Sequence, residues 1–179
     1  MSVSTEDLFV RRSGDVIHVL APRLHFLTGT ALQRLHDGAT VPFDFQLTIS
    51  AGVKSNVVGR SLARYMLSYD VWEEKFRVVR LGNFGKFGSH LSASAAEAWC
   101  LQNTFVSAGA LPADKPLFAR LEVRSVETKE EAALTADSGI SITTLIQLFS
   151  RPIRPQQDHA ILESAPFRLA DLKQPDLKQ

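Results

Sequence analysis

The sequence has few of the features that usually indicate a chemical activity. It contains one cysteine, Cys100, so no disulfide bond can form within the chain. Lysine and arginine total 20 and aspartate and glutamate total 19, which gives a formal net charge of +1. Nucleic acids and anionic membranes bind basic surfaces, and this charge balance indicates none. We therefore expect small molecules or proteins as partners, and no nucleic acid.

Long apolar segments are also absent from the sequence. No run of apolar residues approaches the roughly 18 to 20 that a membrane span needs. The opening "MSVSTEDLFV" lacks the basic start, apolar core and small-residue cleavage site of a signal peptide. Two locations fit these observations: the periplasm, if an export signal has been removed, and otherwise the cytoplasm.

Motifs for catalysis and metal binding are missing too. The five histidines fall in different segments, without the short spacing to other ligands that zinc sites show: His18, His25, His36, His90 and His159. Ser89 precedes His90 but lies in no Gly-x-Ser-x-Gly motif. The loop "GNFGKFGSH" lacks the Gly-Lys-Ser/Thr ending of a phosphate loop. We expect no catalytic residues, no metal, no cofactor and no enzymatic activity.

Size and composition indicate an ordinary globular domain. With 179 residues, 45% of them hydrophobic, the chain can bury roughly 70% of its unfolded surface without a metal or disulfide. There is no internal repeat or low-complexity segment. The sequence predicts a flexible N-terminus over residues 1–13, one domain over 14–172 and a tail over 173–179.

Residue periodicity predicts several strands and at least two short helices. "VPFDFQLTISA", residues 41–51, alternates apolar and polar side chains, which predicts a strand with one core face and one wet or polar face. Similar patterns predict strands over 15–26 and 117–123. Thr30 with Gln33, and Ser94 with Glu97, have the spacing of capping boxes and predict helices near 30–37 and 94–105. Residues 139–150 fit a helix or a strand, and we favour the helix.

The stretch "YMLSYDVWEEKFRVVRLGNFG", residues 65–85, fits two structures. Its apolar residues recur at helical spacing, which would make Asp70, Glu73 and Glu74 candidates for acid–base chemistry. Its aromatic and β-branched residues favour a β-hairpin instead. In a hairpin these three acids mark a solvated turn, where carboxylates keep ordinary pKa values and make poor acids at neutral pH.

Several segments also occur together in a recognisable order. They are "RLHF", "ALQRLHDG" leading into "VPFDFQLTI", "YMLSYDVWEEKFRV", "LFARLEVR", "LIQLFSR" and "PFRLADL". In this order the chain, from about residue 14 to 172, resembles a bacterial family of exported proteins known as domain of unknown function 4390. The resemblance implies paired strands over 64–71 and 75–81 and a location in the cell envelope. It implies no active site.

Together these patterns predict a mainly β protein, an antiparallel β-sandwich or curled sheet with two or three short helices, with an α+β arrangement as the alternative. We expect a non-enzymatic binding or scaffolding domain of the bacterial envelope that contacts an unidentified protein partner. Aromatic residues beside a turn and in a glycine-rich loop are candidate interface anchors if they are exposed. Trp72 can either fold back over the edge of the core or stand exposed as a partner contact, and the first arrangement is the more common one. The predicted partner-binding residues are Trp72, Phe84, Lys86 and Phe87.

The alternative function is that of a carrier. A pocket between the sheet and the helices would then enclose a small apolar ligand. The residues predicted to line it are Phe43, Phe45, Trp99 and Phe105. A carrier needs an enclosed apolar cavity of about 300 Å³ or more, whereas an interaction domain needs a filled core and an uncovered aromatic patch.

Overall fold

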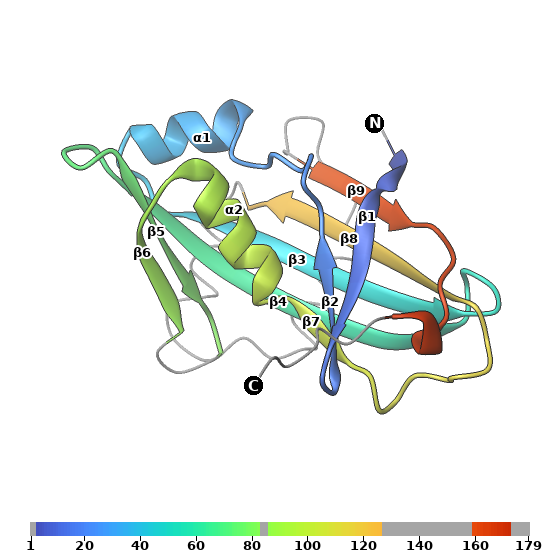
Figure 1. Ribbon diagram of the computed structural model, residues 1–179. Helices are drawn as coiled ribbons and strands as arrows, with labels where there is room; N and C mark the ends of the chain where they lie inside the picture. The colour runs from blue at the N-terminus through green and yellow to red at the C-terminus, as the bar shows by residue number, and fades with distance from the viewer. Residues whose placement is uncertain (1–2, 83–85, 127–158, 173–179) are drawn as a thin grey trace.

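A computed structural model describes residues 3–82, 86–126 and 159–172 (Figure 1). In these ranges the chain forms one sheet with the strand order β6-β5-β4-β3-β8-β9-β1-β2-β7. The strands are β1 (Val3–Ser13), β2 (Val16–Leu20), β3 (Val41–Ala51), β4 (Val57–Asp70), β5 (Lys75–Arg80), β6 (Phe87–Leu91), β7 (Phe105–Ser107), β8 (Leu117–Ser125) and β9 (His159–Ser164). The helices are α1 (Gly29–His36), α2 (Ala93–Gln102) and the 3₁₀ helix η1 (Leu169–Asp171). The predicted mainly β fold is confirmed.

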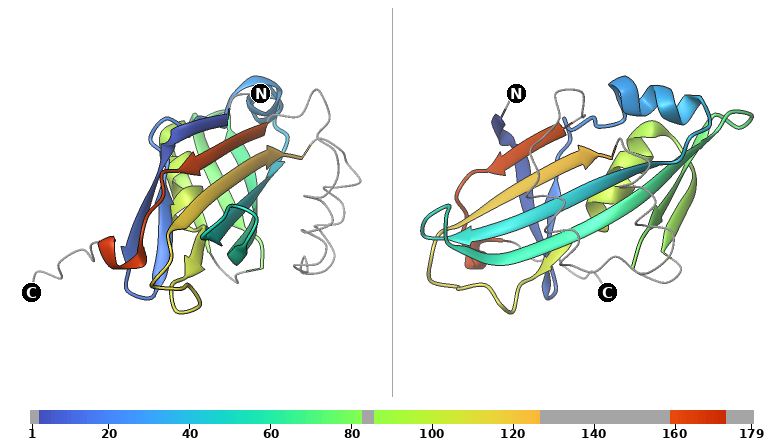
Figure 2. Two further views of the ribbon diagram at one scale, coloured as in Figure 1. Left: turned by 90° about the vertical axis from the view of Figure 1, so that its right-hand side faces the viewer. Right: turned by 180° about the vertical axis from the view of Figure 1, so that it is seen from behind.

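All neighbouring strands are antiparallel except β1 and β9, which run parallel. The sheet curls, so that β7 at one end packs near β4. Helix α2 lies against β2 on one side and against β5 and β6 on the other (Figures 1 and 2). Helix α1 packs beside β3 and β4. The helices therefore cover the side toward which the sheet curves.

Strand β3, which lies inside the sheet between β4 and β8, has the bounds that the sequence predicts. Its apolar side chains all point to the core side, where Phe43 and Phe45 contact the ring of Phe26 at centroid distances of 4.9 and 5.2 Å. Phe45 also packs edge-on against Tyr65 of β4. Such aromatic pairs stabilise a core beyond the area they bury. The aromatic residues of the central strands therefore pack against one another.

The other face of β3 is polar, as one of the two predicted possibilities, but most of it is not wet. Asp44, Thr48 and Ser50 are all buried. Asp44 binds the fully buried Arg64 of β4, with 2.6 Å between Arg64 Nη2 and Asp44 Oδ2. Alternation assigns each side chain to a face, but the burial of that face depends on groups contributed by other strands.

The hairpin prediction for residues 64–81 is confirmed, and a continuous helix is excluded. Strands β4 and β5 pair from Tyr65 opposite Arg80 to Asp70 opposite Lys75. The rings of Tyr69 and Phe76, which face each other across the pair, lie 4.8 Å apart. Cross-strand aromatic contacts of this kind stabilise a hairpin.

Both predicted capping boxes are wrong, although both helices exist. Helix α1 starts after Thr28, whose side chain makes no capping bond, and it ends before Gly38, which has the left-handed φ of 85° expected of a C-terminal glycine. The α2 cap is Ser92, whose Oγ accepts a hydrogen bond from the Ala95 N–H. The side chain of Glu97 is used elsewhere, as described below.

Several other boundaries differ from the predictions. The segment expected to be a flexible N-terminus forms β1, because its backbone pairs with β2 and with the distant strand β9. Strand β2 ends at Leu20 rather than near residue 26, and α2 ends at Gln102, so Phe105 belongs to β7. The second half of the loop expected over residues 82–90 belongs to β6, which spans Phe87–Leu91. The ambiguous segment 139–150 lies outside the described residues.

Candidate functional site

The turn between β4 and β5 presents a large apolar side chain to solvent. Trp72 is 93% exposed and its neighbour Val71 is 53% exposed. The turn projects beyond α1 at one end of the molecule (Figure 1). Trp72 was expected to fold back over the core more often than to stand free, so this exposure corrects the sequence interpretation.

The side chain of Asp70 braces the turn through two hydrogen bonds. One oxygen of the Asp70 carboxylate accepts hydrogen bonds from the backbone N–H of Trp72, at 2.8 Å, and of Glu73, at 3.1 Å. The N–H groups of Glu73 and Trp72 favour the charged carboxylate and hold the pKa of Asp70 below its ordinary value. Glu74 completes the turn with a left-handed φ of 53°.

A groove of about 500 Å³ runs from this turn to strand β6. Its lining includes Asp70 and Glu73 at the turn and Phe87 on β6. Phe87 is 55% exposed, and the Arg77 guanidinium lies over its ring, 5.4 Å from the centroid. We call Val71, Trp72, Arg77, Phe87 and this groove the tip surface.

The structure places two of the four predicted partner-binding residues on the tip surface. Trp72 and Phe87 both have large exposed rings. Lys86 directly precedes β6 and is exposed, and Phe84 lies outside the described residues. A contact of 2.7 Å between His90 Nδ1 and Glu73 Oε2 joins β6 to the turn. Sequence spacing gave no indication of this connection.

The four aromatic residues predicted to line one apolar pocket lie in different surroundings. Phe43 and Phe45 are fully buried in the core, and Phe43 also borders a pocket of about 110 Å³. Trp99 packs on Tyr65, with 6.1 Å between ring centroids. Phe105, on the edge strand β7, contacts the ring of His18 and the guanidinium of Arg80. The contacts of Phe43 and Phe45 are those of core residues.

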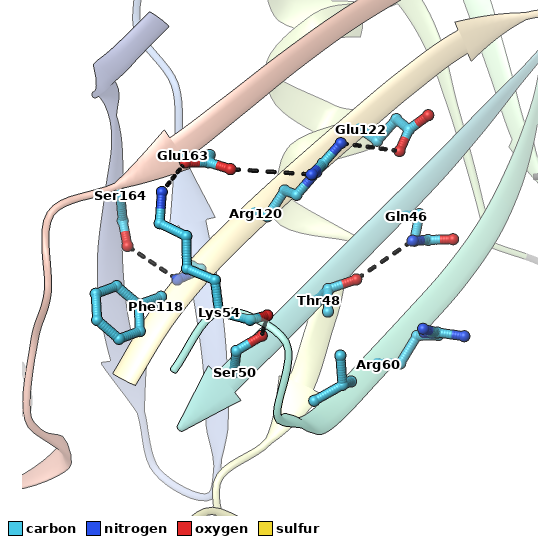
Figure 3. A pocket seen from close by; sticks show the side chains of 12 residues that line it. Gln46, Thr48, Ser50, Lys54, Arg60, Phe118, Arg120, Glu122, Glu163 and Ser164 are labelled. Atoms are coloured by element: carbon cyan, nitrogen blue, oxygen red, sulfur yellow. Dashed lines mark hydrogen bonds and ion pairs between the residues drawn. The ribbon is translucent and has the colours of Figure 1, made fainter. Parts of the chain in front are cut away.

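A second candidate site lies on the polar face of the sheet. Twelve residues line a pocket of about 280 Å³ there (Figure 3), which we call the polar pocket: Gln46, Thr48, Ser50, Lys54, Val57, Arg60, Phe118, Ala119, Arg120, Glu122, Glu163 and Ser164. They come from β3, β4, β8, β9 and the β3–β4 turn. Sequence reasoning missed this site, although the alternation of Arg120, Glu122 and Arg124 placed three charges on one face of β8.

Ion pairs cross the strands around this pocket. Glu122 accepts hydrogen bonds from Arg124 Nε, at 2.7 Å, and pairs with His159 Nε2 at 3.0 Å. Glu163 binds the Lys54 ammonium group. Arg120 lies between the two glutamates, and each of its closest nitrogen–oxygen distances is 3.9 Å (Figure 3).

The described part of the chain shows neither an exposed thiol nor a cluster of metal-binding side chains. Cys100 is buried in α2, and burial raises the pKa of its thiol well above the ordinary value. Among the described residues, no three histidine, cysteine, aspartate or glutamate side chains gather closely enough to hold a metal ion. None of the described helices has the length and apolar character needed to cross a membrane.

The chain has no detectable relative in the three comparisons with known proteins. No family model matches it, and neither a curated protein nor a solved structure is significantly similar to it. The resemblance to the exported bacterial family therefore stays a prediction.

Proposed function

We propose that this protein is a non-enzymatic binding domain that docks a protein partner through the tip surface. The observation that supports this most strongly is the exposure of Trp72, 93%, on a turn held by Asp70. A tryptophan can bury about 150 to 250 Å² at an interface, and such residues often dominate binding energy. Because the turn is fixed before binding, little entropy is lost in ordering it.

The charges beside Trp72 define the chemistry of the partner. The turn itself is acidic, since residues 70–75 carry three carboxylates, Asp70, Glu73 and Glu74, and one ammonium group, Lys75, whereas Arg77 adds positive charge beside Phe87 at the other side of the groove. A complementary surface has an apolar pocket for the indole ring and cationic groups around it. Anionic lipid headgroups would be repelled by the same carboxylates, so the charge pattern favours a protein over a membrane. A location in the bacterial envelope is part of the proposal and rests on the family resemblance alone.

The test compares substitutions at the two ends of the molecule. Trp72→Ser and Phe87→Ser remove the exposed rings, and Val53→Ser is the matched control, because Val53 is 60% exposed but lies in the β3–β4 turn. The full chain, with a photo-crosslinking amino acid at position 71, is exposed to an envelope extract and the crosslinked proteins are identified. Affinity for the purified partner is then measured for each variant.

We expect Trp72→Ser to weaken binding by about 30-fold or more, which corresponds to a hot spot of about 2 kcal/mol. Val53→Ser should leave the affinity unchanged, and Tm should be similar for all three variants. Binding should weaken as salt is raised, because the partner surface is cationic. Equal loss in Val53→Ser, or binding of Trp72 to neutral vesicles with no protein crosslink, would refute the proposal.

A further inference from the structure

The side chains that line the polar pocket carry more positive than negative charge. Its lining has three cationic side chains, Lys54, Arg60 and Arg120, and two carboxylates, Glu122 and Glu163. Both carboxylates already have closer partners than Arg120, since Glu163 binds Lys54 and Glu122 binds Arg124. The 3.9 Å separations leave Arg120 outside hydrogen-bond distance of either glutamate.

Arg60 has fewer polar contacts than Arg120. Within the ranges that the structure describes, its guanidinium makes no hydrogen bond or ion pair, and the side chain is exposed at the pocket edge. The pocket therefore holds two guanidinium groups whose donors are available to a ligand. Guanidinium groups match the geometry of carboxylate and phosphate oxygens.

The strand register brings these two arginines to opposite sides of one small residue. Thr48 of β3 pairs with Arg60 of β4 and also with Arg120 of β8. Directly paired residues share a face of the sheet, and adjacent strands lie about 4.8 Å apart, so the two arginine backbones are separated by about 10 Å. The short threonine side chain leaves room between the two longer ones.

Hydroxyl groups add neutral donors to the same pocket. Thr48 Oγ1 accepts a hydrogen bond from Gln46 Nε2 at 3.3 Å, which leaves its own proton available. Ser164 Oγ accepts from the Ala119 N–H at 2.9 Å and likewise keeps a proton to donate. The pocket thus combines hydroxyl donors with two incompletely paired guanidinium groups.

We propose that the polar pocket binds a small molecule through an oxyanion group, a carboxylate or a phosphate, held between Arg60 and Arg120 above Thr48. The volume of about 280 Å³ is close to the lower end of small-molecule pockets. The polar lining excludes a purely apolar ligand from this site, because burying Arg60 and Arg120 against one would leave their donors unsatisfied. This inference is independent of the tip surface.

The probes are inorganic phosphate and acetate, titrated into the full chain at constant ionic strength, with chloride as the reference anion. Binding is followed by isothermal calorimetry and by amide NMR shifts in β3, β4 and β8. We expect saturable binding of at least one oxyanion and none of chloride. Preference for phosphate or for acetate identifies which group the ligand carries.

Arg60→Gln is the main variant, since its side chain makes no described ion pair and its loss should not affect folding. It should weaken oxyanion binding by about tenfold or more, as expected for a lost charged hydrogen bond. Arg60→Lys should recover part of the affinity, because it restores the positive charge but not the two parallel N–H donors of the guanidinium group. Thr48→Val tests the hydroxyl donor, with Tm measured to confirm folding.

Arg11→Gln is the matched control, because Arg11 is an exposed arginine on β1 outside the pocket. It should change the affinity less than twofold. Trp72→Ser should also leave oxyanion binding intact, which separates this inference from the docking proposal. Equal effects of Arg60→Gln and Arg11→Gln, or equal shifts with phosphate, acetate and chloride, would show that only general charge screening occurs and would overturn the inference.

Discussion

The side chain of Glu97 connects α2 to a segment 70 residues earlier, and its removal should destabilise the fold strongly. Glu97 is buried, and its Oε1 accepts a hydrogen bond from the Leu27 N–H at 3.0 Å. Its Oε2 lies 3.1 Å from His25 Nδ1. These contacts fix the chain between β2 and α1 against the helix.

The loss in free energy of unfolding on Glu97→Ala can be calculated from the contacts that are removed. The buried Leu27 N–H loses its acceptor, which costs about 1 to 3 kcal/mol. The lost Cγ methylene removes further packing, at about 0.8 kcal/mol. We expect a total of about 2 to 4 kcal/mol, which for a chain of this length lowers Tm by about 4 to 16 °C.

Urea unfolding followed by tryptophan fluorescence measures this loss, with thermal unfolding as a second assay. Glu97→Gln is the informative comparison, because its amide oxygen can still accept from Leu27, and it should cost less than half as much. Asp114→Ala, at an exposed loop position, should change stability by no more than about 0.5 kcal/mol. Equal losses for the Ala and Gln variants at position 97 would refute the reasoning.

Three further predictions concern other parts of the structure. Gly59→Ala should cost about 1 to 3 kcal/mol in urea unfolding, because the new Cβ would lie 2.8 Å from Val106 Cγ1; an unchanged midpoint would contradict this close approach. The pKa of Asp70 lies below its ordinary 3.8, so its support of the turn should persist at neutral pH and disappear as the pH falls through that lowered pKa. Amide shifts of Trp72 should report a midpoint below 3.8, and a midpoint above it would contradict the hydrogen bonds. The buried Cys100 thiol should react with a thiol reagent only after unfolding, and rapid labelling of the native protein would show that it is accessible.

Local patterns in the sequence predicted those features that local chemistry controls. The bounds of β3 follow from side-chain alternation, which the pleated backbone imposes on any strand with a buried face. The hairpin at residues 64–81 follows from aromatic and β-branched residues on both sides of a polar turn. Trp72 and Phe87 were recognisable as candidate anchors because large rings beside turns and glycines often lie at a surface.

The same local rules failed where a distant segment competes for a side chain. Glu97 has the correct spacing from Ser94 for a capping box, yet its carboxylate binds Leu27 and His25, and Ser92 caps the helix. The exposure of Trp72 was misjudged for a related reason, since burial depends on whether the rest of the fold reaches the turn.

The sequence alone determined that this chain forms amphipathic strands, a hairpin and two short helices, because these depend on neighbouring residues. Only the tertiary structure decided which strands outside that hairpin pair, and therefore which distant side chains meet. Arg60 and Arg120 are 60 residues apart, yet both lie beside Thr48 because β4 and β8 flank β3. Strand register is set by the packing of the whole sheet. Local sequence patterns therefore could not predict that the residues of the polar pocket lie together.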